Sequence, residues 1–352
     1  MNIFDMIKLL IEKKGSDLHI IAGSSPTLRV AGRLQPIAGT PVLNPEQTLI
    51  LINPLLTKEQ LDYIKLHKEL DFGFQFGDKN RFRVNVYHAK GAMAAALRLI
   101  PQKIKSIDEL LLPDIFHQFT TYKQGLVLVT GPTGEGKSTT LAALIEEINQ
   151  QRAEHILTIE DPIEFIYESK KSIVSQREMN HDTQDWSLAL RSALREDPDV
   201  VLVGEIRDYE TIASAITVAE TGHLVFTTLH TSTASQTVDR IIDVFPAHQQ
   251  AQIRQQLAGS IKAVVSQRLV PSLQGGRVAV VEIMLANSAV KNLIRESKAF
   301  QIDNVIQTGG AEGMILIETS LLRRVKQGLI SVETAREYAF RLDLFDQLLE
   351  GS

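Results

Sequence analysis

Apolar residues in the second part of the chain form short continuous runs, separated by segments in which they recur at helical spacing. Four runs are rich in Val, Leu and Ile, which is typical of parallel strands buried on both faces, and they lie at 126–129, 156–159, 200–203 and 224–227. The first run is followed by an amphipathic stripe made of Leu141, Leu144, Ile145 and Ile148. A later helix has the apolar face Trp186, Leu190, Ala193 and Leu194, and we expect it to begin at Asp182 or Thr183 and to end near Asp197-Pro198. This alternation predicts an α/β domain whose parallel sheet is covered by helices on both faces.

The two ends of the chain follow other patterns. Beyond about Pro246 the pattern is mostly helical, apart from one expected strand at 278–284. The first 100 residues begin with a helix on Ile3, Met6, Ile7 and Leu10; short alternating segments at 17–21 and 26–30 and helices near 46–52 and 58–67 follow. Longer alternating segments at 71–76, 81–87 and 92–99 predict an antiparallel meander with hairpin turns at 77–80 and 89–91. We therefore expect an α+β domain at 1–100, a proline-punctuated linker at 101–120 and the α/β domain at 121–352.

Composition excludes several classes of protein. The chain has 352 residues, enough for about two domains, and its 37 basic and 42 acidic residues give a formal net charge of -5. This balance gives no reason to expect nucleic acid as a partner. Because the chain has no cysteine, disulfides and cysteine-ligated zinc are excluded. No apolar run approaches the roughly 20 residues that span a bilayer, and residues 1–5 lack the apolar core of a signal peptide. We expect a soluble, cytoplasmic protein.

The most specific motif comes directly after the first strand run. Residues 131–138 read G-P-T-G-E-G-K-S, which fits the phosphate-loop pattern G-x-x-x-x-G-K-S between a strand and a helix. Glycines let successive backbone N–H groups turn toward phosphate oxygens, and the helix N-terminus adds partial positive charge. Lys137 supplies a charge for the β- and γ-phosphates, and Ser138 a hydroxyl for Mg²⁺. A chance glycine-rich turn would not match on both flanks. The predicted nucleoside triphosphate site contains Gly131, Thr133, Gly134, Gly136, Lys137, Ser138 and Thr139.

Acidic residues follow two of the strand runs, at the edge of the sheet where α/β folds bind their ligands. Glu205 comes after the run 200–203 and fits a Walker B-like acid that holds the metal; the alternative is that it only caps the following helix. Glu160, Asp161 and Glu164 come after the run 156–159. The sequence alone leaves open which of these three acids faces the attacking water.

Two histidines and three arginines are weaker candidates for residues of the nucleotide site. His223 and His230 flank the last strand run at a spacing that fits no metal motif, so either a satisfied polar role or a hydrogen bond to the γ-phosphate is compatible with the pattern. Alternation puts Arg81 and Arg83 on one face of a predicted strand, and Arg98 lies on the next strand. Such arginines are usually solvated. A role as arginine fingers requires this domain to pack over a triphosphate.

Several motifs in a fixed order resemble those of the secretion ATPase superfamily, which powers type II secretion and type IV pili. They are GPTGEGKSTT at 131–140, EDPIE at 160–164, SQRE at 175–178, REDPDVVLVGEIRD at 195–208, ETGH at 220–223 and TLHT at 228–231. Within this superfamily the chain is most similar to the pilus retraction ATPases. The resemblance runs nearly end to end, from GSDLH at 15–19 to AVKNLIRE at 289–296.

The resemblance implies roles for individual residues. Glu164 matches the general base of the family's acidic motif, and Glu205 matches the Walker B acid that holds Mg²⁺ through water. His223 and His230 match the family's histidine motif, which favours a functional role for both. Arg83 and Arg98 correspond to phosphate-sensing arginines, with Arg81 as a less certain third nucleotide-binding arginine. The segment 289–296 matches a motif needed for retraction rather than for hydrolysis.

The same resemblance implies an architecture and an activity. The family fold is a PAS-like N-terminal domain joined to a RecA-like P-loop domain, assembled as a homohexamer that uses ATP and Mg²⁺. It implies a motor for pilus retraction and twitching motility, working on an inner-membrane platform protein and the pilus machinery at the cytoplasmic face of the inner membrane. Neither nucleic acid nor direct membrane insertion is expected.

Some positions depart from the family pattern and keep alternatives open. Glu135 stands where a small residue is usual, and an acid in an anion cradle weakens phosphate binding unless its side chain points away. Val290 and Lys291, and the segment 315–321, also differ from the usual motifs. The alternatives are an accessory retraction paralogue, a pilus-extension or type II secretion ATPase, a RecA-like nucleic-acid motor, and a ring subunit that binds ATP without turning it over. The lack of a four-cysteine zinc module disfavours the extension and secretion branch.

Overall fold

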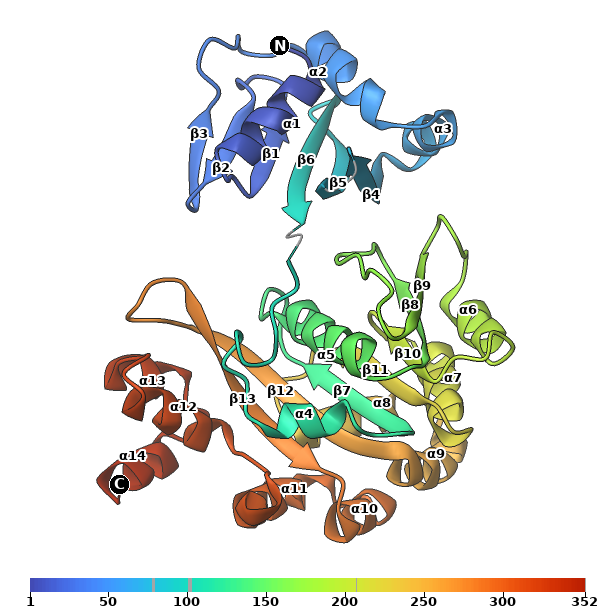
Figure 1. The fold of residues 1–352 in the computed structure, drawn as a ribbon, viewed down its shortest axis with the longest axis vertical. Coiled ribbons are helices and arrows are strands. Elements are labelled where there is room, and N and C mark those ends of the chain that lie inside the picture. Colours follow the sequence, from blue (N-terminus) through green and yellow to red (C-terminus); the bar gives the residue numbers. More distant parts are fainter. Residues whose placement is uncertain (78–79, 101–102, 207, 352) are drawn as a thin grey trace. The chain divides into compact units, whose positions relative to one another are not determined.

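Two compact units make up the chain. The computed structural model describes residues 1–352 except 78–79, 101–102, 207 and 352. The first unit contains Met1–Lys103 and Pro162–Ile166, and the second contains Ile104–Asp161 and Tyr167–Ser352 (Figure 1). The short segment Pro162–Ile166 thus packs with the first unit, although the pattern predicts the α/β domain for this part of the chain.

The first unit is an α+β layer built on one antiparallel sheet, with strand order β3-β2-β1-β6-β5-β4. Its strands are β1 Asp17–Ile20, β2 Thr27–Val30, β3 Arg33–Pro36, β4 Glu69–Phe76, β5 Asn80–Ala89 and β6 Ala92–Ile100. Its helices are α1 Ile3–Glu12, α2 Pro45–Ile52, the 3₁₀ turn Asn53–Leu55 and α3 Lys58–His67. Each α-helix starts with a reciprocal capping box, at Asn2, Asn44 and Thr57 respectively.

The predicted meander of the first unit is confirmed. Strand β5 pairs antiparallel with both β4 and β6, and its alternation buries Phe82 and Val84 completely. Lys90 and Gly91 both adopt positive φ in a two-residue hairpin turn, as the sequence predicts for 89–91. The other predicted turn includes residues 78–79, which lie outside the described residues. Strand β3 was not predicted, because it lies at the edge of the sheet with all four residues exposed and shows no apolar alternation.

The second unit contains a sheet of order β13-β12-β7-β11-β10-β8-β9, in which only the pairing of β12 with β13 is antiparallel. The strands are β7 Gly125–Thr130, β8 His155–Glu160, β9 Ile173–Glu178, β10 Val200–Val203, β11 Leu224–Leu229, β12 Ile261–Pro271 and β13 Arg277–Leu285. The α-helices are α4 Ile115–Phe119, α5 Lys137–Gln151, α6 Trp186–Ala193, α7 Tyr209–Glu220, α8 Ala234–Asp243, α9 Ala247–Ser260, α10 Ser288–Arg295, α11 Ile302–Thr308, α12 Ile317–Lys326, α13 Val332–Tyr338 and α14 Leu342–Glu350, with 3₁₀ turns at Ala299–Gln301 and Gly309–Glu312. Within the described residues, no helix is long and apolar enough to cross a bilayer.

Helices cover both faces of this sheet, as the continuous apolar runs predict. Leu126 and Leu128 of β7 belong to a core that also contains residues of α7, α8 and α9. Val127 and Val129 are just as fully buried but point to the opposite face, since successive side chains of a strand alternate. That face is covered by α5, which packs on β7 and β11 and lies in front of the sheet in Figure 1.

Two strands and one helix start of the second unit differ from the prediction. The chain beyond Pro246 is mostly helical and the expected strand at 278–284 is β13, but β12, which spans eleven residues between β7 and β13, was not predicted. Its polar centre, Ser266 and Gln267, interrupts the apolar run by which a buried strand is recognised. Strand β9 was also missed, since this edge strand is polar and only partly buried. Helix α6 begins after Asp185, whose side chain accepts a hydrogen bond from the Leu188 N–H at 2.7 Å, and not at Asp182 or Thr183.

The segment after residue 103 differs from the expected linker. Residues 104–120 belong to the second unit, and Ile107, Leu112, Phe116 and Phe119 are buried there. The rings of Phe116 and Phe119 lie 5.4 Å apart, a usual separation for an aromatic pair. The segment therefore contributes to the core of the second unit and does not behave as a solvated connection.

We predict that Phe116→Ala lowers the stability of the second unit by about 3–5 kcal/mol, because it removes a fully buried ring and leaves a cavity. Thermal and urea unfolding followed by circular dichroism measure this effect. Gln118→Ala, on the exposed face of the same helix, serves as the control and should change stability by less than about 0.5 kcal/mol. Equal stability of the two variants would show that the segment is a linker after all.

Candidate nucleotide-binding site

A glycine loop links β7 to α5 and has the backbone of an anion cradle. Gly131, Gly134 and Gly136 adopt positive φ values of 141°, 84° and 78°. Gly136 is the N-cap of α5, so the loop ends at the positive end of a helix dipole. Within the described residues, the amide N–H groups of residues 133–136 donate to no acceptor of the chain. Four adjacent N–H groups without an acceptor are what a phosphate requires.

Strand β12 lies directly against this loop and makes hydrogen bonds to it. A Cβ atom on Gly131 would lie 2.3 Å from the carbonyl oxygen of Gln267, so the first loop position has room only for glycine. At the end of β7, the Thr130 hydroxyl donates to Ser266 Oγ at 3.0 Å. The side-chain amide of Gln267 donates to the Glu135 carbonyl at 2.6 Å and accepts from Thr140 Oγ1 at 2.7 Å. Sequence patterns gave no sign of Gln267, because its partners lie more than one hundred residues away.

The sequence leaves open whether the side chain of Glu135 points into the anion cradle or away from it. Its carboxylate accepts a hydrogen bond from the backbone N–H of Leu269 in β12 at 2.5 Å. The carboxylate is thereby directed onto the neighbouring strand, as required if the acid is not to occupy the cradle itself. Its charge is still part of the loop, and a charge-assisted bond to one N–H does not cancel it.

Three side chains line up along neighbouring strand ends. Strands β7, β11 and β10 are adjacent in the sheet, and their carboxyl ends lead to Lys137, His230 and Glu205. The Lys137 ammonium is buried and donates to the carbonyls of Gly131 and Pro132 at 2.7 and 3.0 Å. It lies 3.5 Å from His230 Nδ1, and His230 Nε2 lies 2.8 Å from the Glu205 carboxylate. The structure thus brings together these three predicted residues.

The partners of His230 fix its tautomer. An ionised Glu205 only accepts hydrogen bonds, so Nε2 carries the proton. The ammonium of Lys137 only donates, so Nδ1 accepts. His230 in this arrangement links the cation of the phosphate loop to the acid after β10. This geometry favours the functional reading of His230 over that of an isolated polar residue.

The acids after β8 separate into two environments. Glu160 is buried and accepts hydrogen bonds from Thr158 Oγ1 at 2.7 Å and from Gln176 Nε2 at 3.2 Å. Glu164 belongs to the first unit and is one-third exposed, with its carboxylate 3.5 Å from Arg83 Nη1. Glu160 therefore lies buried inside the second unit, whereas Glu164 belongs to the first unit and is paired with a cation.

Two of the predicted arginines gather around the segment that carries Glu164. Arg83 also binds Asp71 through Nε at 2.9 Å and Nη2 at 2.5 Å, so its guanidinium bridges two acids. Arg81, on the same face of β5, donates from Nε to the carbonyl of Ile163 at 3.3 Å. These contacts all lie within the first unit.

Arg98 has a separate partner. It lies opposite Arg83 on β6 and donates from Nε to Asp17 at 2.9 Å. Burial opposes ionisation of Asp17, but hydrogen bonds from Ser16 and Arg98 hold the pKa of this carboxyl below its usual range. The guanidinium of Arg98 remains largely exposed.

His223 is not brought to the loop. It precedes β11, whereas His230 follows it, and a six-residue strand separates its two ends by about 20 Å. Nδ1 of His223 lies 2.9 Å from the carbonyl of Val218 and 3.2 Å from Thr221 Oγ1. Within this chain His223 closes the turn between α7 and β11.

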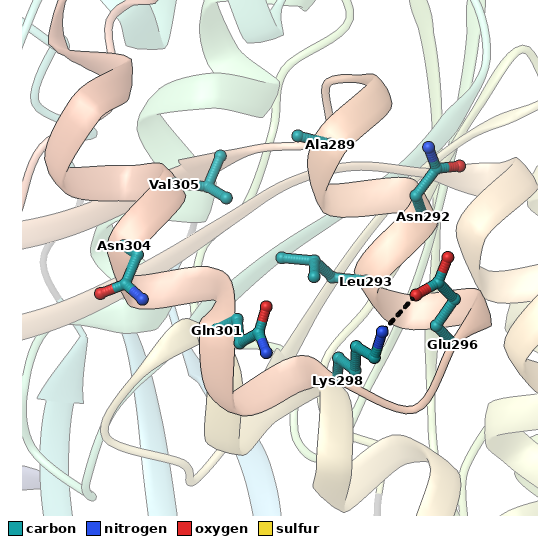
Figure 2. Close-up of a pocket in the computed structure, with 8 residues that line it drawn as sticks. All are labelled: Ala289, Asn292, Leu293, Glu296, Lys298, Gln301, Asn304 and Val305. Atoms are coloured by element: carbon teal, nitrogen blue, oxygen red, sulfur yellow. Dashed lines mark hydrogen bonds and ion pairs between the residues drawn. The ribbon is translucent and has the colours of Figure 1, made fainter.

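The segment 289–296 forms α10 and one wall of a pocket of about 370 Å³ between α10 and α11. Figure 2 shows Ala289, Asn292, Leu293 and Glu296 on this wall, with Lys298, Gln301, Asn304 and Val305 opposite. Val290 and Ile294 are buried in the core, as the stripe predicts, while Leu293 is only partly buried. Burial, together with the charges of Lys262 and Arg295, lowers the pKa of Lys291. The non-core face of α10 is therefore polar and carries a group of cations.

Comparison with known proteins fits this geometry. The family model described as "Type II/IV secretion system protein" matches residues 2–275. The chain belongs to this family. It is 48% identical to the type IV pilus retraction ATPase PilT of Pseudomonas aeruginosa over 339 residues, covering 96% of this chain and 98% of that protein. It is 50% identical to a twitching motility protein of Neisseria gonorrhoeae over 320 residues, covering 91% and 85% of the two chains.

Solved structures of the type II/IV secretion family extend the likeness to three dimensions. A crystal structure of the pilus retraction motor PilT with bound ADP matches with a TM-score of 0.91 and 44% identity, and the match covers 99% of each chain. The fold class predicted from the sequence is confirmed: a RecA-like P-loop domain of α/β type follows an N-terminal α+β domain of PAS-like type.

We predict that Glu135→Gln strengthens ATP binding about two- to fivefold. The amide oxygen still accepts the hydrogen bond from Leu269, while a negative charge is removed from the phosphate loop. Titration of the purified protein with a fluorescent ATP analogue measures the change. The matched variant Glu135→Asp keeps the charge but is too short to reach Leu269, and it should weaken binding. Equal or weaker binding by the Gln variant would show that the charge does not act on the nucleotide.

Proposed function

We propose that this chain is an ATPase motor that drives retraction of type IV pili, working as a homohexamer at the cytoplasmic face of the inner membrane. The observation that carries the proposal is the alignment of Lys137, His230 and Glu205 beside the glycine loop. An isolated loop would support nucleotide binding alone. The added histidine and acid provide the groups that a hydrolase needs near a γ-phosphate. Similarity over nearly the whole length to PilT supports retraction as the use of this hydrolysis.

The donor set fits Mg²⁺. The hydroxyl of Ser138 and the carboxylate of Glu205 are oxygen ligands of the kind that Mg²⁺ prefers, the latter through water. No group of three or more acids and histidines suited to a metal occurs in the part of the chain that the structure describes. This agrees with a metal held mainly by phosphates and water. When bound, Mg²⁺ neutralises charge on the β- and γ-phosphates.

The chain's own residues supply the remaining steps. The backbone N–H groups of residues 133–136 bind phosphate oxygens, and Lys137 places its charge at the β- and γ-phosphates. Thr139 follows Ser138 on the first turn of α5 and completes the nucleotide-binding loop. His230 holds a proton on Nε2 toward Glu205 and hydrogen bonds near the γ-phosphate. His223 is the second histidine of the proposed motif, and within this chain it closes the turn between α7 and β11.

Glu164 is the proposed general base, and the arginines of the first unit are proposed to sense the γ-phosphate. The ion pair of Glu164 with Arg83 supports this reading, since it orients the carboxylate. Arg98, largely exposed, is available to an anion, and Arg81 is the third candidate. Glu160 is less suited to the role of base, because it is buried and already accepts two hydrogen bonds.

Coupling to the pilus machinery is assigned to α10. Two cations of α10, Lys291 and Arg295, and the neighbouring Lys262 of β12 have no ion pair with an acid in the described residues, so this group suits an acidic surface of an inner-membrane platform protein. No role for nucleic acid follows from this cluster, because three cations in an overall acidic chain do not form the basic stripe that a nucleic-acid backbone needs.

We predict that Glu164→Gln lowers kcat for ATP hydrolysis about 10²–10⁴-fold while ATP binding is retained, because the amide cannot accept the proton of the water. Turnover of the purified protein and nucleotide binding are measured together. Glu168→Gln makes the same chemical change at an exposed position four residues later and should leave kcat unchanged. Hydrolysis near the wild-type rate in Glu164→Gln would return the role of base to Glu160 or Asp161.

We predict that Lys291→Ala with Arg295→Ala leaves ATP turnover within about twofold of wild type but abolishes twitching motility, since both side chains lie outside the core of α10. The control pair Arg323→Ala with Lys326→Ala removes two exposed cations from the last turn of α12 and should preserve both activities. Loss of turnover together with motility in the α10 variant would show that these residues are structural.

Deleting the gene in its host tests the function as a whole. Loss of a retraction motor leaves pili on the cell surface without twitching, and complementation with Lys137→Ala fails to restore movement. Disappearance of surface pili would instead assign the chain to pilus extension. Normal twitching after deletion would assign it to an accessory role. DNA-stimulated turnover of the purified protein would identify a nucleic-acid motor, and absence of turnover a ring subunit that only binds ATP.

A further inference from the structure

The side chain of Gln267 on β12 contacts both the phosphate loop and the first turn of α5. It is 2% exposed and lies on β12 directly beside the phosphate loop. Nε2 donates to the Glu135 carbonyl at 2.6 Å, and Oε1 accepts from Thr140 Oγ1 at 2.7 Å. The orientation of the amide is unambiguous, because a carbonyl oxygen only accepts and so faces the NH₂ group. One residue thus ties the middle of the loop to the first turn of α5.

The bond to Glu135 determines where a neighbouring donor points. In a trans peptide the C=O and the following N–H point in opposite directions. Holding the Glu135 carbonyl against β12 therefore directs the Gly136 N–H away from β12. This N–H is among the groups without an acceptor in the chain. Glycines at 134 and 136 leave the loop backbone free to rotate, and fixing these residues costs conformational entropy.

We propose that Gln267 is a positioning residue for the phosphate loop, which holds the peptide between Glu135 and Gly136 in the orientation that binds phosphate before the nucleotide arrives. The proposal rests on the proposed function and deepens it, because it explains why the loop requires a strand that follows it by more than one hundred residues. Gln267 does not contact the nucleotide in this role; it acts through the loop backbone.

Two variants separate this role from plain structural support. Gln267→Met keeps the length of the side chain and removes both polar atoms. Gln267→Glu keeps an acceptor for Thr140 but loses the donor to Glu135 and brings a carboxylate to a carbonyl oxygen. Both should raise KM for ATP and the Kd for ADP about tenfold or more, with the larger rise in the Glu variant. Because bound phosphate itself orders the loop, kcat at saturating ATP should stay within about twofold of wild type.

Ser266→Ala is the matched control. It removes a hydrogen bond of similar burial from the adjacent residue of β12, where the partner is Thr130 and not the loop. It should leave KM and Kd unchanged. Thr140→Val removes only the second contact of Gln267 and should raise Kd by less than Gln267→Glu does. Circular dichroism and thermal unfolding establish that each variant is folded.

The outcomes are distinct. An unchanged KM and Kd in Gln267→Met and Gln267→Glu would overturn the proposal. So would a fall in kcat at constant KM, since that result indicates a smaller fraction of folded protein. A rise of the same size in Ser266→Ala would show a general effect of β12. If the wild-type protein hydrolyses no ATP, the proposed function fails, but the Kd for ADP in the four variants still decides the role of Gln267.

Discussion

The lateral order of three strands is the constraint on which the site depends. Strand β11 lies between β7 and β10, so the residue that follows it sits between the residues that follow its neighbours. Register is fixed by backbone pairing, with Thr130 opposite Leu229 and Val203 opposite Thr227. Neighbouring strands lie about 4.8 Å apart, and a slip of one residue would turn every side chain to the other face. The contacts of His230 with Lys137 and Glu205 follow from this register and from no local motif.

Much of this arrangement could be predicted from the sequence, because its signals are local. The loop 131–138 has its flanking strand and helix within a few residues. The apolar run 200–203 predicts a buried strand, and the acid Glu205 follows it closely in the sequence. What could not be predicted depends on partners distant in the chain. Strand β12 was missed because Ser266 and Gln267 are polar, and their hydrogen-bond partners lie on distant segments: Thr130 at the end of β7, Glu135 in the loop and Thr140 in α5. The sequence could not show where the Glu135 carboxylate lies, because its partner, the N–H of Leu269, is also distant in the chain.

The ion-pair partners of the charged residues in the first unit could not be predicted from the sequence either. Alternation placed Arg81 and Arg83 on one face, but only the structure shows that Arg83 bridges Asp71 and Glu164. Partly exposed ion pairs of this kind contribute about 0–1 kcal/mol to stability. Their effect is geometric: a bidentate guanidinium has few orientations that satisfy two carboxylates at once. The acid at 164 thereby acquires a defined direction without belonging to a helix or a strand.

The close approach of β12 to Gly131 separates two reasons for a glycine in the loop. At Gly134 a Cβ would meet nothing within 4 Å, so only its backbone angle matters. At Gly131 a Cβ would collide with the backbone of another strand. That glycine is needed to close the sheet, whether or not a nucleotide is ever bound. A variant with a larger residue at this position would fail to fold. In a cell the change would lower the amount of the protein and would not produce a slower motor.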